Sequence, residues 1–133
     1  MYLLDTNACI RVLNNTSPPL IARLRQCDAA QIHLSSVVKA ELLFGARHSA
    51  RVAANLQLIE RFAVPFTPLP FDDLCADHYG LIRADLAAQG QPIGPNDLLI
   101  AATARAFDLT LVSHNTAEFT RVVGLRIEDW EVE

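Results

Sequence analysis

The order of apolar and polar stretches along the chain alternates between short strand patterns and longer helical ones. Short, mostly apolar runs are typical of buried strands, whereas apolar residues three or four positions apart indicate helices. Strands are expected at 2–4, 31–34, 64–68, 109–113 and 126–128, and helices at 6–13, 19–26, 36–44, 50–62, 72–89 and 96–107. Strands that alternate with helices predict a parallel sheet covered on both faces.

Glycine and proline residues suggest where these elements end. Gly45 and the polar residues after it are expected to end the helix at 36–44. Pro65 and Pro68 lie within the strand pattern at 64–68, which favours an edge position because proline cannot donate to a central ladder. The glycines and prolines of 90–95 predict a tight loop before the last long helix.

Four carboxylates stand at positions where an acidic residue needs an explanation: Asp5, Glu41, Asp97 and Glu118. Asp5 follows the first strand directly, and Glu118 comes soon after the strand at 109–113. In open parallel sheets, ligands bind beyond the carboxyl ends of the strands. A buried carboxylate is costly unless it is paired or bound to a metal, so their convergence would create a site for a hard cation such as Mg²⁺.

Each carboxylate also has a purely structural interpretation. Asp5 is a favourable helix cap, Asp97 complements the dipole of the helix that it opens, and Glu118 suits a solvated helical turn. Glu41 is harder to explain in this way, because helical projection places it in the apolar stripe of its helix. A buried ion pair with an arginine remains the structural alternative for Glu41.

Composition narrows the class of protein. The 133 residues are expected to form one domain (1–133), and half of them are hydrophobic. The net charge of −4 argues against a general nucleic-acid binder, although ten of the eleven basic residues are arginines, which grip phosphates well. No apolar run is long enough for a membrane span, no signal peptide is expected, and the three scattered cysteines indicate a reduced, cytoplasmic protein.

Four short motifs, in order, resemble those of PIN-domain ribonucleases, and in particular the VapC-type toxins of bacterial toxin–antitoxin pairs. They are Leu-Leu-Asp-Thr-Asn at the start, Val-Val-Lys-Ala-Glu-Leu-Leu-Phe-Gly-Ala, Pro-Ile-Gly-Pro-Asn-Asp-Leu-Leu-Ile-Ala-Ala, and Thr-Leu-Val-Ser-His-Asn-Thr-Ala-Glu-Phe, with Gly-Leu-Arg-Ile-Glu-Asp-Trp after it. The similarity covers essentially the whole chain. It implies a three-layer α/β/α sandwich with a parallel central sheet, in agreement with the residue pattern.

The resemblance also implies a metal site. It gives Asp5 and Asp97 the role of direct ligands to Mg²⁺ or Mn²⁺, with Glu41 and Glu118 placing water or a second ion. Many PIN domains have an aspartate where this chain has Asn115, so Glu118 is expected to supply the fourth charge. Further hydrogen bonds to metal-bound water are expected from Thr6, Asn7 and Asn115.

The activity implied is hydrolysis of an RNA phosphodiester, with tRNA as the default substrate. The resemblance further implies a VapB-like antitoxin and a homodimer. Several apolar residues either belong to the core or form a groove for an antitoxin segment: Ile10, Leu13, Leu20, Leu24, Leu43 and Phe44.

Two other classes of protein agree less well with the sequence. A phosphoryl-transfer enzyme or receiver domain fits poorly, because Asn7 stands where a second aspartate is needed and Lys39 is the only lysine. A non-catalytic PIN-like module that only docks RNA or protein is the remaining alternative. The four acids argue against it, because without a metal they would repel phosphates.

Overall fold

Five parallel strands form one sheet in the order β3-β2-β1-β4-β5. The computed structural model describes residues 1–132, so Glu133, the last residue of the expected domain, lies outside the described residues. The strands are β1 (Tyr2–Leu4), β2 (Ile32–Ser35), β3 (Thr67–Leu69), β4 (Thr110–Val112) and β5 (Ile127–Glu128). The sheet is parallel, as the strand and helix pattern predicts, and β3 lies at its edge as the prolines indicated. The strand expected at 64–68 covers Thr67–Leu69 instead, because residues 64–66 form the turn that follows α4.

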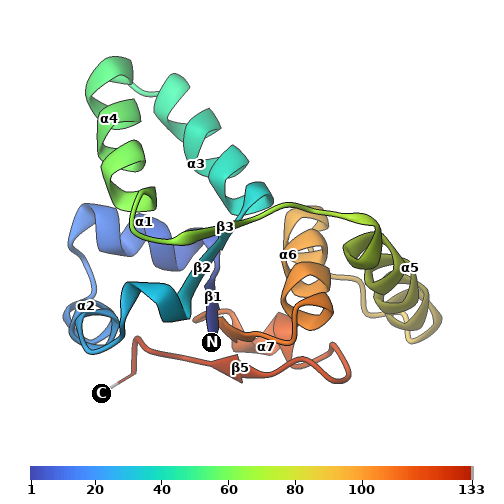
Figure 1. The fold of residues 1–133 in the computed structure, drawn as a ribbon. Helices are drawn as coiled ribbons and strands as arrows, with labels where there is room; N and C mark the ends of the chain where they lie inside the picture. The colour runs from blue at the N-terminus through green and yellow to red at the C-terminus, as the bar shows by residue number, and fades with distance from the viewer. Residues whose placement is uncertain (133) are drawn as a thin grey trace.

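Helices cover the sheet on both sides and give the α/β/α sandwich that the sequence predicted (Figure 1). The helical elements are α1 (Thr6–Asn14), α2 (Pro18–Arg25), the short 3₁₀ helix η1 (Ala29–Gln31), α3 (Ser36–Arg47), α4 (Val52–Ala63), α5 (Asp73–Ala88), α6 (Pro95–Ala106) and α7 (Thr116–Phe119). Figure 1 shows α1 and α2 on one side and α5 and α6 on the other, while α3 and α4 form a hairpin that projects from the body.

The end of α3 corrects one prediction. The helix does not end at Gly45 but continues to Arg47, and α4 begins at Val52 rather than at residue 50. A glycine inside a helix costs only about 1 kcal/mol relative to alanine. Buried Leu42 and Ala46 on either side of Gly45 hold this part of α3 against the core, so packing outweighs that cost.

Local sequence explains most of the other boundaries. The side chains of Asp5, Ser35 and Asp72 each accept a hydrogen bond from the backbone N–H three residues later, and so cap α1, α3 and α5. Asn15 ends α1 in the left-handed conformation (φ 56°), which asparagine tolerates better than most residues. These caps place the start of each helix at a defined point of the sheet rim.

The core lies on both faces of the central strands. Leu3, Leu4 and Leu111 on β1 and β4 are fully buried, as is Ile100 on α6. The backbone N–H of Asp5 donates to the Val112 carbonyl at 3.1 Å, so Asp5 lies beside the end of β4. None of the helices in the described part of the chain combines the length and apolar character needed to cross a membrane.

Candidate active site at the carboxyl ends of the strands

Asp5 begins the site at the carboxyl end of β1. Its Oδ1 accepts the Ala8 N–H at 2.8 Å, so Asp5 caps α1 as the structural interpretation proposed. The residue is 4% exposed, and burial raises the pKa of its carboxyl group above 3.8. Hydrogen bonds from Ser113 and Ala8 oppose that rise in pKa, and the nearby Glu131 adds to it. Capping therefore does not relieve the cost of burying this charge.

Glu41 does not form the buried arginine pair that was its structural alternative. Its Oε1 accepts a 2.8 Å hydrogen bond from the Thr6 hydroxyl, and no ion pair to it occurs among residues 1–132. The bond joins α1 to α3 across 35 positions of sequence. Thr6, expected to bond metal-bound water, thus orients a carboxylate in this structure, whereas Asn7 is exposed at the start of α1.

Asn115 bridges the other two carboxylates. Its amide Nδ2 donates to Glu118 Oε2 at 2.6 Å and, in a longer contact, to Asp97 Oδ2 at 3.4 Å. Asn115 precedes α7, but its side chain forms no cap hydrogen bond with that helix. Both residues considered for the fourth position therefore lie in one cluster, and the amide holds Glu118 beside Asp97.

The pKa of Asp97 reflects the burial of this carboxyl group and the carboxylates around it. Burial, the neighbouring Glu118 and, to a smaller extent, the charges of Asp5 and Glu41 together raise the pKa of Asp97 to about 6. Like charges this close disfavour ionisation of one another. Hard oxygen donors and an excess of negative charge are the features that suit Mg²⁺ or Mn²⁺, so these residues fit the expected metal.

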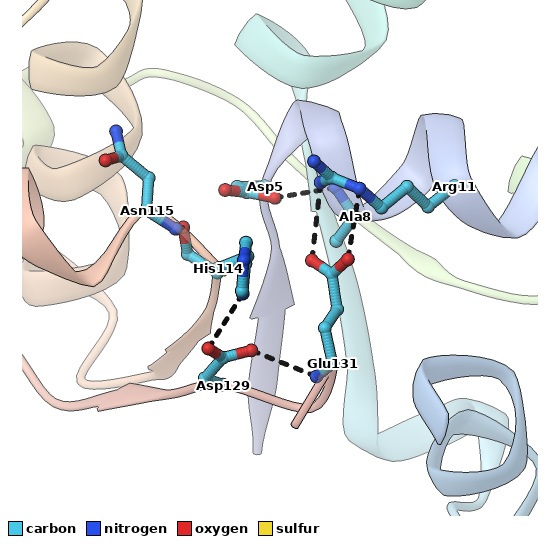
Figure 2. A network of polar contacts seen from close by, with 8 residues as sticks. Asp5, Ala8, Arg11, His114, Asn115, Asp129 and Glu131 are labelled. Atoms are coloured by element: carbon cyan, nitrogen blue, oxygen red, sulfur yellow. Dashed lines mark hydrogen bonds and ion pairs between the residues drawn. The ribbon is translucent and has the colours of Figure 1, made fainter. Parts of the chain in front are cut away.

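A second polar network, which the sequence did not predict, lies next to Asp5 (Figure 2). Arg11 forms a two-pronged ion pair with Glu131, with Nε 3.0 Å from Oε1 and Nη1 3.3 Å from Oε2. His114 Nδ1 lies 2.9 Å from Asp129 Oδ2, and the Glu131 N–H donates to Asp129 Oδ1 at 3.0 Å. The network ties the chain after β5 to α1 and to the end of β4.

This network also contains the tightest group of metal-type donors in the described residues. One donor atom from each of His114, Asp129 and Glu131 lies within 4.8 Å of the others, and the four predicted acids form no group as compact as this. Arg11 compensates the charge of Glu131, and His114 Nδ1 lies within hydrogen-bond distance of Asp129. A signal was available in the sequence: the acids at 128, 129 and 131 follow the last strand, at the same rim.

Comparisons with known proteins agree with this fold. The family model for the PIN domain matches residues 2–125. The chain is 43% identical to the tRNA(fMet)-specific endonuclease VapC of Shigella flexneri, over 97% of each chain, and 42% identical to ribonuclease VapC2 of Haemophilus influenzae, again over 97% of each. The crystal structure of DNA-bound VapBC from Salmonella typhimurium superposes with a TM-score of 0.92 at 38% identity, covering 97% of each chain.

The fold and the match to the family model together define a PIN domain with acidic residues at the rim of its sheet. The chain belongs to the PIN-domain family, in the VapC group of that family. The structure of VapBC2 from Rickettsia felis bound to promoter DNA gives a similar superposition, with a TM-score of 0.91 and 35% identity over 97% of this chain and 98% of that one. The resemblance drawn from the sequence motifs is confirmed.

Proposed function

We propose that this protein is a metal-dependent endoribonuclease toxin whose acidic rim hydrolyses RNA and is blocked by a cognate antitoxin. The observation that carries the proposal is the cluster at the sheet rim, where the Asn115 amide holds Glu118 beside Asp97, close to the buried Asp5. Burial and the neighbouring carboxylates raise the pKa of Asp97 to about 6 there. A site that gathers uncompensated negative charge beside a strand end is suited to a cation and then to a phosphodiester. The VapC relatives are named ribonucleases, which supports the same reaction.

In this proposal, Asp5 and Asp97 hold Mg²⁺ or Mn²⁺ directly. Bound there, such an ion would lower the pKa of a coordinated water and offset the charge that builds on the phosphate oxygens. Glu41 and Glu118 orient water, and the hydrogen bonds from Thr6 and Asn115 fix the direction of those two carboxylates. Asn7 and Asn115 add hydrogen bonds to metal-bound water.

The proposed substrate is a tRNA, and the Shigella relative suggests initiator tRNA, since that protein is named a tRNA(fMet)-specific endonuclease. Such a substrate places the protein in the cytoplasm. Sequencing the 5′ ends of RNA fragments after brief expression tests this assignment, because specific cleavage produces one dominant new end. Fragment ends spread over many RNAs would contradict it.

The proposed inhibitor is a VapB-like antitoxin, supported by structural neighbours that are VapBC complexes. A cleft of about 270 Å³ opens between α1, α3 and α4, and its lining includes Ile10, Leu13, Leu58 and Glu41. Ile10 and Leu13 were among the apolar residues expected in a core or groove, whereas Leu20, also among them, is fully buried core. An apolar helix in this cleft would end near Glu41, where an arginine could pair with the acids.

RNA cleavage with Mg²⁺ and with EDTA, in wild-type protein and in Asp5→Asn, tests the reaction. Cleavage that needs both the metal and Asp5 supports it. Binding of RNA without cleavage under all conditions would instead support the alternative, a non-catalytic PIN-like module.

Co-expression with the small neighbouring open reading frame, followed by co-purification and a ribonuclease assay, tests the antitoxin. Light scattering on the purified protein tests the proposed homodimer. A monomer that purifies alone, and that cells tolerate at high expression with its acids intact, would contradict both partner assignments.

A further inference from the structure

We infer that the outer half of the α3–α4 hairpin is an RNA-binding platform, on which Phe44 and His48 stack with an unpaired base while Arg47 and Arg51 grip the flanking phosphates. The inference rests on the proposed ribonuclease function and adds the surface that holds the substrate. The hairpin is the part of the fold that projects beyond the sheet rim (Figure 1).

The platform continues from the acidic site along one face of α3. Phe44 is three residues after Glu41 and His48 seven residues after it, so helical geometry places all three on the same side of the helix. The rise of about 1.5 Å per residue puts Phe44 about 4.5 Å and His48 about 10 Å further along the helix axis than Glu41. A strand of RNA leaving the acidic site in this direction meets the two rings.

The two rings form an exposed stacked pair. The Phe44 and His48 centroids are 5.6 Å apart with the planes only 12° from parallel, and Phe44 is 68% exposed. A stacked pair of this kind presents an aromatic face to solvent, which is the feature that proteins use to hold unpaired bases. Stacking tolerates any base, so the platform is suited to a loop or single-stranded stretch of RNA.

The charge of this part of the hairpin matches a phosphate backbone. Residues 42–59 contain two arginines and one histidine but no carboxylate, in a chain whose net charge is −4. Within residues 1–132, neither Arg47 nor Arg51 is ion-paired with a carboxylate. Both guanidinium groups are therefore available for phosphates, which the acidic rim itself would repel.

The turn that carries these residues is held in place by its own hydrogen bonds. The Ser49 hydroxyl donates to the Ala46 carbonyl at 2.5 Å, and the Asn55 side chain donates to Ser49 Oγ at 2.8 Å. The end of α3 is thereby fixed to the start of α4. A surface fixed before binding loses less entropy when RNA binds.

The test compares Phe44→Ala with Phe44→Trp and with Leu81→Ala, which truncates an equally exposed side chain on α5. The probe is a synthetic RNA oligonucleotide that carries the cleavage position mapped with wild-type protein, and its affinity is measured in EDTA. We expect Phe44→Ala to bind about tenfold more weakly, within the usual range for loss of one stacked base. Phe44→Trp and Leu81→Ala should bind like wild type.

Replacing single nucleotides of the oligonucleotide by abasic ones identifies the base that stacks on Phe44. An abasic residue at that position should weaken wild-type binding about tenfold and leave the affinity of Phe44→Ala unchanged, because the contact is already lost. The inference would be overturned if the losses of affinity from the abasic residue and from Phe44→Ala were additive, or if wild type and Phe44→Ala bound the intact oligonucleotide equally well. In either case, RNA cleavage by wild type would leave the proposed function standing. Absence of both cleavage and RNA binding in wild type would overturn the proposed function, and this inference with it.

The arginines are tested by salt dependence. Arg47→Ala with Arg51→Ala should reduce the slope of log affinity against log salt by about 1.4, since a phosphate contact to single-stranded nucleic acid contributes about 0.7. The matched pair Arg25→Ala with Arg83→Ala removes the same charge elsewhere and should leave the slope nearly unchanged. Equal slopes for the two pairs of variants would contradict the inference. So would a Phe44→Ala protein that binds RNA like wild type but no longer dimerises or no longer binds the antitoxin, because the surface would then be a protein contact.

Discussion

The Asn115 amide donates a 2.6 Å hydrogen bond to Glu118 Oε2, one helical turn further along the chain, and thereby holds that carboxylate beside Asp97. An amide cannot replace the charge of an aspartate, but it can orient a neighbouring glutamate that supplies it. The fourth carboxylate of the site thus arises from two residues that act together.

Glu118→Gln should reduce RNA cleavage far more than Asn115→Ala. The first change removes a charge from the site, whereas the second removes only the group that orients it. Rates of RNA cleavage at saturating Mg²⁺ measure the difference. A crippled Asn115→Ala and a fully active Glu118→Gln would show that the amide, and not the glutamate, fills the fourth position.

Asp97→Asn should abolish cleavage without unfolding the protein. The amide keeps the size of the side chain but lacks the charge that a hard cation requires. Relief of the repulsion from Glu118, Asp5 and Glu41 should leave the variant as stable as wild type or slightly more stable. Circular dichroism and urea denaturation check the fold, and wild-type activity at matched metal concentration would refute the ligand role.

The stability of the metal-free protein should rise as the pH falls from 7 to 5. The pKa of Asp97 is about 6 in the folded chain against 3.8 for the free group, so the folded chain binds this proton more tightly than the unfolded one. The cost of ionising Asp97 in the folded chain therefore lowers the free energy of unfolding by its full amount above pH 6. This cost decreases as the pH falls from 6 to 3.8, and it is absent below pH 3.8.

The expected gain between pH 7 and pH 5 is about 0.5–1 kcal/mol, allowing for solvent screening of a partly exposed group. Urea denaturation in EDTA at the two pH values measures it. The same measurement on Asp97→Asn is the control, because the other titrating groups contribute to both proteins and drop out of the difference between them. The variant should lack the gain that Asp97 supplies. An identical response in wild type and variant would show that Asp97 is not its source.

Mg²⁺ or Mn²⁺ should stabilise wild-type protein and not Asp97→Asn. An ion at 100 times its dissociation constant adds about 2.7 kcal/mol to the free energy of unfolding, if it binds only the folded chain. Thermal melts with increasing Mg²⁺, with Ca²⁺ as a comparison for size, measure the effect. Equal stabilisation of both proteins would point instead to the group formed by His114, Asp129 and Glu131.

Trp130→Ala should lower the free energy of unfolding by about 3 kcal/mol. The indole is 5% exposed, forms a T-shaped contact with Tyr2 on β1 with ring centroids 4.9 Å apart, and donates to Glu128 Oε1 at 3.0 Å. It anchors the segment that carries Asp129 and Glu131. Trp130→Phe, which keeps most of the apolar contact, is the control, and a loss of under about 0.5 kcal/mol in Trp130→Ala would contradict this anchoring role.

Local pattern was sufficient to predict the order of strands and helices, the cap at Asp5 and the edge position of β3, although β3 begins at Thr67 rather than at residue 64. The spacing of apolar residues reports which face of an element is buried, and a cap such as Asp5 acts within three residues of itself. The end of α3 was mispredicted because local propensity disfavours Gly45, while the decisive contribution came from the packing of Leu42 and Ala46 against other elements.

The sequence by itself determined that the chain alternates strands with helices and that four carboxylates stand where the fold can bring them together. Only the tertiary structure decided that Thr6 orients Glu41, that Asn115 bridges two acids, and that Glu131 pairs with Arg11 across 120 positions. The physical reason is that hydrophobic periodicity acts along a single element, whereas a hydrogen bond depends on distances of about 3 Å between side chains from different elements.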